Sequence, residues 1–325
     1  MFSVSQNFRT PYFYNFDLQV EKSFGNAAVW QIGYVGSEGR KLNMMFSMPT
    51  TGTNFNTIDQ LQSVGTSNYN SLQTTFKLRS WHGLTSQYSF TWSHALDEMS
   101  EYRGPISDSL NRLVDYGNGD YDTRRLFTAS FVYQVPKASW AHGWSDRVVN
   151  GWQVSSLWNF HTGQPSDELL SGLYLIGGVG PYSASHTFSA AAGGEQWWKP
   201  SAFALSEAGT PTLARNTLHA PGYGAVDLSV FKNIPITERI KVQLRMETFN
   251  LLNRINLSSG PGSVGGSCGA PIQLNKTLPD TLANRTCTTA NGFGFVNDTI
   301  GDFNGAPGIG PGEAFNMQLA IKILF

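Results

Sequence analysis

The sequence has little charge and no excess of either sign. Asp, Glu, Lys and Arg make up 14% of its 325 residues, and 22 basic against 23 acidic side chains leave a formal net charge of −1. Nucleic-acid-binding proteins usually carry a basic patch or stripe, so this balance argues against a nucleic-acid partner. A disordered chain would be rich in charge and poor in aromatic residues, and this sequence is the opposite.

Long hydrophobic runs are also missing. The best candidate, 172–180, reaches only about half of the roughly 18–20 residues that a membrane-spanning helix needs, and glycine interrupts it. The first sixteen residues have no basic segment followed by an apolar core, so they do not form a signal peptide. Either the protein stays inside the cell or its beginning is missing.

Cysteine is rare, and catalytic motifs are lacking. Cys268 and Cys287 are the only cysteines, which excludes a disulfide-rich scaffold and a C-x-x-C zinc site; whether they pair is open at this point. No GxSxG, HExxH or P-loop motif is present, no GxGxxG follows a strand, and the histidines are not spaced as metal ligands. We therefore expect neither an enzyme nor a bound cofactor.

Aromatic and turn-forming residues are abundant. The chain has 9 Trp, 12 Tyr and 21 Phe together with 34 Gly and 15 Pro, a composition that favours a large β-protein. Apolar and polar residues alternate in nine segments, as in strands with one apolar face. The predicted strands lie near 12–22, 27–35, 69–79, 84–94, 126–135, 151–161, 224–231, 240–250 and 315–325.

The charged residues in these strands fall on the face opposite the apolar one. No Asp, Glu, Lys or Arg occurs among the positions assigned to the apolar faces. The polar faces carry Asp17, Glu21, Lys77, Arg79, Asp227, Lys241, Arg245, Glu247 and Lys322.

The connections between predicted strands alternate between short and long. Loops above about 15 residues are uncommon in compact soluble domains, yet the connections 36–68, 95–125, 162–223 and 251–314 all exceed this length. Short periplasmic turns, long extracellular loops and strands of about 10 residues are typical of an antiparallel transmembrane β-barrel. We therefore predict an all-β barrel segment whose charged face lines the lumen. The alternative is a soluble β-sandwich with long loops.

An acidic segment in one long connection offers closely spaced oxygen ligands. Asp115, Asn118, Asp120 and Asp122 are of the kind that calcium accepts, although the full EF-hand pattern is absent. A solvated loop is the competing interpretation. In the next long connection, Trp197 and Trp198 could stack on a ligand such as a sugar, or pack within the loop.

Several segments resemble the C-terminal barrel of Oar-like TonB-dependent outer-membrane receptors. The resemblance covers most of the chain from Tyr12 to Phe325, and it rests on the combination of motifs rather than on any single one. The segments are GYVGSEGRKL, NYNSLQTTFKLRSWHGLTSQYSFTWSHALDE, DYGNGDYDTRRLFTASFVYQVP, NGWQVSSLWNFHTGQP and DLSVFKNIPITERIKVQLRMETFNLLNRINL, followed by a terminal aromatic residue.

The resemblance implies more than the chain contains. Family barrels have 22 strands, an internal plug and, in this branch, a preceding carboxypeptidase-regulatory-like domain. With nine strands, residues 1–325 would form a partial barrel domain without plug, signal peptide or TonB-contacting segment. On this expectation, either the start is truncated or the chain is cut from a longer one.

The resemblance also implies a function and partners. The protein would lie in the bacterial outer membrane, surrounded by lipid, and pass a large solute with energy from the TonB complex, reached through the missing N-terminal part. In such proteins a terminal aromatic, here Phe325, is the signal for the barrel-assembly machinery. Cys268 and Cys287 would face the oxidising side, where a disulfide can form. The rival function is that of a secreted or surface adhesin built as a β-sandwich.

Overall fold

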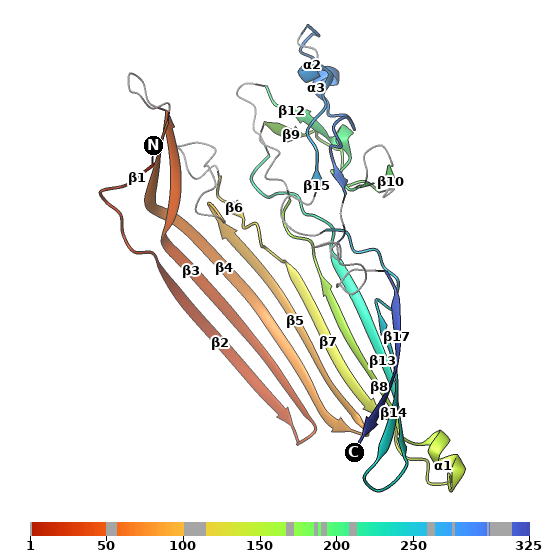
Figure 1. Ribbon diagram of the computed structural model, residues 1–325. Helices are drawn as coiled ribbons and strands as arrows, with labels where there is room; N and C mark the ends of the chain where they lie inside the picture. The colour runs from red at the N-terminus through yellow and green to blue at the C-terminus, as the bar shows by residue number, and fades with distance from the viewer. Residues whose placement is uncertain are drawn as a thin grey trace.

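A sheet of long, tilted strands dominates the structure, a computed structural model (Figure 1). It describes residues 2–49, 57–100, 115–166, 172–184, 188–189, 194–207, 213–258, 264–274, 277–297, 299 and 314–325. Strands lie at all nine predicted positions. They are β2 (Tyr12–Phe24), β3 (Ala28–Pro49), β4 (Thr57–Trp81), β5 (Leu84–Asp97), β7 (Arg125–Gln134), β8 (Trp152–His161), β13 (Tyr223–Pro235), β14 (Lys241–Phe249) and β17 (Asn316–Leu324).

Strands that are neighbours in the sheet follow one another along the chain. The order is β17-β14-β13-β8-β7-β5-β4-β3-β2, with antiparallel pairing throughout. Two short strands are added beside this path: β1 (Phe2–Val4) pairs in parallel with β4, and β6 (Gly117–Asn118) pairs with β5. This is the up-and-down arrangement of a barrel wall, open at the edges of β2 and β17.

The registers align the apolar positions of neighbouring strands on one face of the sheet. Leu18 pairs with Tyr34, Tyr34 with Leu72, and Leu72 with Trp92, so one face carries a continuous row of large apolar groups. These side chains are not covered within the described chain, since Leu18 is 71% exposed and Trp92 54%. The apolar face therefore needs an apolar environment from outside.

The connection predicted over 36–68 is not a loop. β3 and β4 continue as one tall hairpin, in which Met44 and Phe46 are buried. A register shift next to Lys41, whose φ is 55°, marks a bulge in this extension. The prediction is wrong for 36–49 and 57–68 because these residues are largely polar or glycine and hide the strand pattern; 50–56 lie outside the described residues.

The short turns lie together at the end of the sheet where the chain also ends (Figure 1). His82 and Gly83 both have positive φ, 49° and 86°, which suits a two-residue hairpin turn of type I′. The turn between β7 and β8 contains an unpredicted helix, α1 (Trp144–Val149). Within the described ranges, none of the helices has the length and apolar character needed to span a bilayer.

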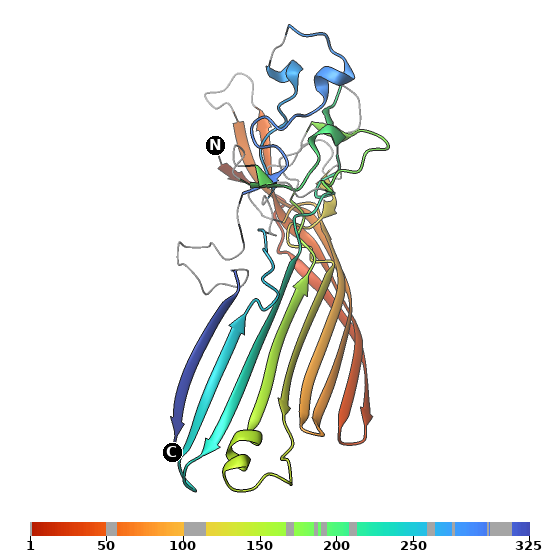
Figure 2. The same ribbon diagram turned by 90° about the vertical axis from the view of Figure 1, so that its right-hand side faces the viewer.

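The described parts of the two longest connections, between β8 and β13 and between β14 and β17, form one folded unit at the opposite end of the sheet (Figure 2). We term this unit the loop module. Its four-stranded sheet takes β10 and β11 from the first connection and β15 and β16 from the second. Its elements are β9 (Leu173–Leu175), β10 (Phe188–Ser189), β11 (Gly194–Gln196), the 3-10 helix η2 (Pro200–Ala202), β12 (Phe203–Leu205), β15 (Val264–Gly265), α2 (Pro271–Leu274), α3 (Leu282–Arg285) and β16 (Phe295–Val296).

Candidate functional site

The polar face of the sheet carries the charged residues that the alternation predicted. The registers place on it Asp17, Glu21, Lys77, Asp227, Lys241, Arg245, Glu247 and Lys322, and Arg79 follows Lys77 by two residues. Neighbouring side chains bond to one another: Arg245 Nε donates to Gln243 Oε1 at 2.5 Å, and Gln243 Nε2 donates to Asn233 Oδ1 at 2.8 Å. The Arg245 guanidinium also lies 5.2 Å from the ring centre of Phe231. Hydrogen bonds between side chains thus hold part of this wall in place.

The apolar face is not free of charge, and the prediction is wrong at its ends. Lys22 shares this face with its register partner Trp30, and Lys232 with its partner Trp152; both lysines lie near the short turns. These positions come at the end of each alternating segment, where the strands leave the apolar centre. The charges therefore mark a boundary of the apolar face.

The opposite end of the apolar face has a similar boundary. Glu38 and Arg40 lie on this face in the extended part of β3 and form an ion pair of 3.0 Å. Both were assigned to a loop by the sequence, so their side-chain direction could not be predicted. The apolar face is thus flanked by charge on both sides.

Trp198 belongs to the core of the loop module, so of the two alternatives that the sequence left open, it packs within the loop. It is 1% exposed, and its ring centre lies 6.1 Å from that of Phe203 and 6.2 Å from that of Phe293. Trp197 is partly buried. Its Nε1 donates to the carbonyl of His219 at 2.8 Å, and its ring meets Tyr182 edge-on at 6.0 Å. Both indoles therefore stabilise the module itself.

The two cysteines form a disulfide within the second connection. Cys268 and Cys287 have Cα atoms 4.9 Å apart, and both are buried in the module core. The backbone N–H of Cys287 donates to the carbonyl of Phe203 at 2.8 Å, which joins the disulfide to the first connection. The pairing left open by the sequence is made at the contact between the two loops.

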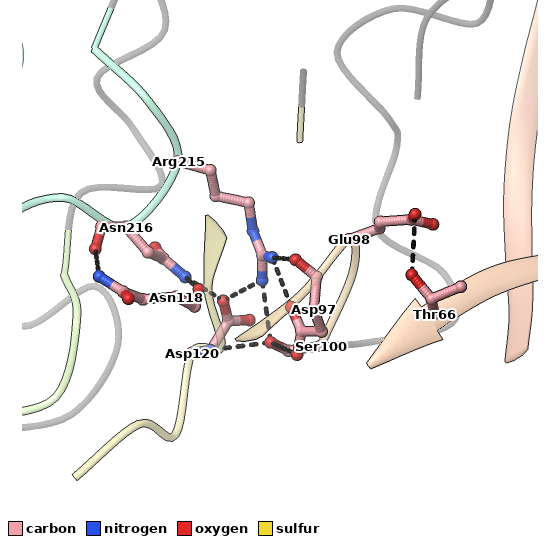
Figure 3. Close-up of polar contacts among 8 residues, drawn as sticks. All are labelled: Thr66, Asp97, Glu98, Ser100, Asn118, Asp120, Arg215 and Asn216. Carbon is pink, nitrogen blue, oxygen red and sulfur yellow. Dashed lines mark hydrogen bonds and ion pairs between the residues drawn. The ribbon is translucent and has the colours of Figure 1, made fainter. Parts of the chain in front are cut away.

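A partly buried ion-pair cluster joins the loop module to the sheet (Figure 3). Arg215, from the first connection of the module, donates to Asp97 Oδ1 and to Asp120 Oδ1, each at 2.5 Å. Its Nη2 also donates to Ser100 Oγ at 2.9 Å. Asp97 ends β5 and Asp120 lies between β6 and β7, so one arginine fixes three parts of the chain. We term these residues the Arg215 junction.

Asparagine side chains extend the junction. Asn118 Nδ2 donates to the carbonyl of Asn216 at 2.7 Å, and Asn216 Nδ2 donates back to the carbonyl of Asn118 at 2.7 Å (Figure 3). Asn216 is fully buried and also donates to Asp120 at 2.6 Å. Nearby, Thr66 donates to Glu98 at 3.0 Å. The acidic segment is thus held by protein donors.

The side chains proposed as calcium ligands already have partners within the protein. Asp120 faces Arg215, and Asp122 accepts from the N–H of Ala95 at 2.8 Å and lies 3.7 Å from Arg124. In the described ranges, no three His, Cys, Asp or Glu side chains gather around a common point that could hold a metal ion. Asp115 is buried and Asn118 is used as above. The geometry gives the acidic segment a structural role.

Burial and charge shift the pKa of two groups near the junction. Burial alone would lower the pKa of Arg215, but the hydrogen bonds and charges of Asp97 and Asp120 raise it above its ordinary value. Burial lowers the pKa of His219, which the charge of Asp122 opposes. Arg215 therefore stays charged, and His219 is held neutral at neutral pH.

Sequence reasoning missed Arg215, Asp97 and Asn216. They come from loops or strand ends, and no spacing connects them, since Arg215 and Asp97 are 118 positions apart. The only available signal was the cluster of acidic residues, which requires a counter-charge when buried.

Comparison with known proteins assigns the chain to a family. The family model described as "Outer membrane beta barrel domain" matches residues 1–288. No curated protein matches the sequence.

Among solved structures, three outer-membrane proteins show low similarity. The outer membrane transporter YddB from Escherichia coli has 10% identity and a TM-score of 0.45, covering 77% of this chain and 30% of that one. The FrpB iron transporter from Neisseria meningitidis has 11% identity and a TM-score of 0.42, covering 78% and 29%. The pyoverdine receptor FpvA from Pseudomonas aeruginosa, bound to pyoverdine, has 9% identity and a TM-score of 0.40, covering 75% and 26%. This chain thus spans less than a third of each.

The family match and the architecture of the sheet point to the same fold. A family model that covers most of the chain coincides with an antiparallel sheet of sequentially paired strands, one face of which is apolar and uncovered. The chain belongs to the outer membrane beta barrel domain family, whose members lie in the bacterial outer membrane.

Proposed function

We propose that this chain is the C-terminal part of the barrel of an Oar-like TonB-dependent transporter, through which a large solute crosses the outer membrane. The observation that carries the proposal is the two-faced sheet with a folded loop module at one end. On this proposal the polar face lines the lumen, where Arg245 and Glu247 contact the plug or hydrate the wall. The role is transport without catalysis.

The apolar face supports the assignment to lipid. Leu18, Leu319 and Ile321 are 71%, 72% and 75% exposed, and soluble proteins rarely leave a continuous apolar surface of this kind uncovered. A secreted β-sandwich adhesin would cover it with a second sheet. In the described part of the chain, the other sheets belong to the loop module at the end of the strands (Figure 2).

The height of the apolar face fits a membrane. On β2 it extends from Tyr14, the register partner of Glu38, to Lys22. At about 3.4 Å per residue and a tilt of about 45°, this stretch rises about 19 Å along the membrane normal. That is within the apolar band of about 25 Å of outer-membrane barrels.

The loop module is the candidate for solute selection. It lies at the end of the sheet opposite the short turns, and on the proposed topology that end faces the outside (Figure 1). Its own apolar core and its disulfide hold it in a fixed shape. A preformed surface of this kind can contact a solute before it enters the lumen.

The open edges of the sheet indicate the missing partners. A barrel wall within lipid must pair all of its backbone groups, so β2 and β17 require further strands. We propose that the rest of a longer receptor supplies these strands, the plug and the contact with TonB. The barrel-assembly machinery would engage the last strand, where Phe325 is 99% exposed.

Solute uptake tests the proposed function. Cells with the full-length protein, cells without it and cells without TonB are given the same mixture of solutes, and depletion of each from the medium is measured. We expect at least one large solute to be depleted only when both proteins are present. Depletion that depends on the receptor but continues without TonB would overturn the energy coupling.

A further inference from the structure

The turn between β7 and β8 exposes large apolar side chains in an unusual concentration. We term residues 136–150, which include α1, the α1 knob. Within it Trp140 is 70% exposed, Trp144 80% and Val148 56%. The three residues are spaced by four, and Trp144 and Val148 lie one turn apart on α1, so they share one side of the helix. Nothing in the proposed transport path uses them.

The knob is an ordered structure. Asn150 is buried, its Oδ1 accepts from the N–H of Ala138 at 2.7 Å, and its Nδ2 donates to Asp146 Oδ1 at 2.7 Å. Ser145 Oγ donates to the carbonyl of His142 at 2.8 Å. The tryptophans are therefore presented by a fixed scaffold.

The knob is bound to the apolar face of the wall. Lys232 Nζ donates to the carbonyl of Val148 at 2.9 Å and to that of Asn150, and Trp152 Nε1 donates to the same Val148 carbonyl at 3.0 Å. Lys232 and Trp152 are register partners, and the Lys232 ammonium lies 5.0 Å from the Trp152 ring centre. Both side chains lie on the apolar face, so the last carbonyls of α1 are held on that side of the sheet.

A glycine allows this close attachment. Gly151 has a φ of 84°, and a Cβ atom there would lie 2.3 Å from the carbonyl oxygen of Asn233. Asn233 N donates to Gly151 O at 2.8 Å across the same contact. The NGW sequence at 150–152 thus combines the side chain that orders the knob, the residue that permits its approach and the ring that meets Lys232.

We propose that the α1 knob is a membrane anchor that places Trp140 and Trp144 in the headgroup region of the periplasmic leaflet. The exposed side of the knob continues the apolar face of the wall. The proposal therefore rests on the proposed function, which assigns that face to lipid. Tryptophan favours this interface, where its ring is apolar and its N–H finds water or headgroup oxygens. The exposed cations Lys137 and Arg147 can lie beside lipid phosphates. The partner is phospholipid.

A spin label at position 144 tests the anchor. Because the two native cysteines form a disulfide, Trp144→Cys supplies the only free thiol of the chain, and position 144 is exposed enough to carry the label. The labelled full-length protein is placed in phospholipid bilayers, and collision rates with oxygen, which concentrates in lipid, and with a water-soluble nickel chelate are compared. Matched controls are Leu244→Cys, whose register partner is Lys232, and Glu238→Cys, in the exposed turn between β13 and β14.

The anchor predicts that the ratio of oxygen to nickel collisions at position 144 lies well above the ratio at 238 and below the ratio at 244. A label at 144 that behaves like 238 while 244 behaves as lipid-exposed would overturn the anchor and leave the wall assignment intact. An aqueous ratio at 244 would instead overturn the face assignment, and the anchor with it.

Discussion

Arg215 Nη1 donates to Asp97 Oδ1 at 2.5 Å, and the two residues are 118 positions apart in the sequence. Asp97 is the last residue of β5, whereas Arg215 belongs to the loop module. The contact therefore transmits any displacement of the module to the end of a barrel strand. A second carboxylate, Asp120, bonds the same guanidinium, so the position of the module is fixed relative to two connections.

Replacing Arg215 by Met should loosen the loop module. The substitution leaves Asp97 and Asp120 without their counter-charge. Removing one partner of a fully buried pair costs about 3–5 kcal/mol, and the cost is smaller for this partly buried pair, which solvent screens in part. Faster hydrogen exchange in 213–222, with the strands unchanged, is the expected result. Arg239→Met, in an exposed short turn, is the control. Unchanged exchange in the Arg215 variant would show that the junction does not hold the module.

Replacing Leu18 by Arg should be far more costly than replacing Gln19 by Arg. Leu18 lies midway along β2 on the apolar face, whereas Gln19 lies on the polar face near Asp17 and Glu21. Arginine facing lipid near mid-membrane costs about 2–4 kcal/mol, while a lumen-facing arginine costs little. Denaturant titration of the full-length protein refolded in lipid measures the difference. Similar losses for both variants would contradict the face assignment.

Opening the disulfide should destabilise the loop module without affecting the strands. Cys268 and Cys287 close a loop with a sequence separation of 19, and closing a loop of about this size stabilises by about 3 kcal/mol in the chain-entropy model. The Cys268→Ser, Cys287→Ser double variant should be cut by protease in 264–297 more quickly than the native protein. Reductant should reproduce the effect in the native protein but not in the variant. Equal cleavage of both proteins, with and without reductant, would refute a stabilising role.

Mild acid should weaken the loop module through His219. Burial lowers its pKa in the folded state, against the opposing charge of Asp122, so the unfolded segment binds a proton more readily. The stability from neutral His219 is complete above the unfolded pKa of about 6.5 and is lost as the pH falls from there to the folded pKa. His219→Gln should reduce the pH dependence of protease cleavage in the module between about pH 7.5 and 5. His142→Gln, in the exposed part of the knob, should leave the pH profile unchanged; a profile unaltered by His219→Gln would rule out this residue as the cause.

Deleting Phe325 should reduce assembly in cells far more than it reduces refolding into lipid. The ring ends the chain after β17 and is fully exposed there, so refolding into lipid should lose at most the burial of one ring, about 1.5–3 kcal/mol. In cells, the amount of assembled full-length receptor should fall sharply. Immunoblotting of outer-membrane fractions measures it, and normal levels would argue against Phe325 as an assembly signal.

The long strands could be predicted because the two faces of the wall impose a strict period of two. In β2 this period is unbroken from Tyr14 to Val20, and the registers reproduce it. The extension of β3 around Met44 and Phe46 could not be read in the same way, because Gly39, Ser47 and their neighbours do not sort by polarity. Pairing with β4 and the bulge at Lys41 decide that conformation.

The candidate site was predictable only where it depends on single strands. Alternation is enough to place Arg245 and Glu247 on the polar face. It could not tell Trp197 from Trp198, since adjacent residues of a loop differ in burial only through the fold around them. Asn250 and Asn253, with φ of 48° and 47°, likewise owe their role to the turn after β14, where Asn253 Oδ1 accepts from the N–H of Phe315 at 3.0 Å.

The shared core of the loop module constrains the order of biogenesis. Trp198 and Phe293 come from connections on either side of the β13–β14 hairpin, so their contact can form only once both connections have reached the same side of the membrane. Both cysteines, in contrast, lie in the second connection, and their bond can close before export of that segment without tying it to the first. Completion of the core therefore depends on both connections, whereas the disulfide depends on the second connection alone.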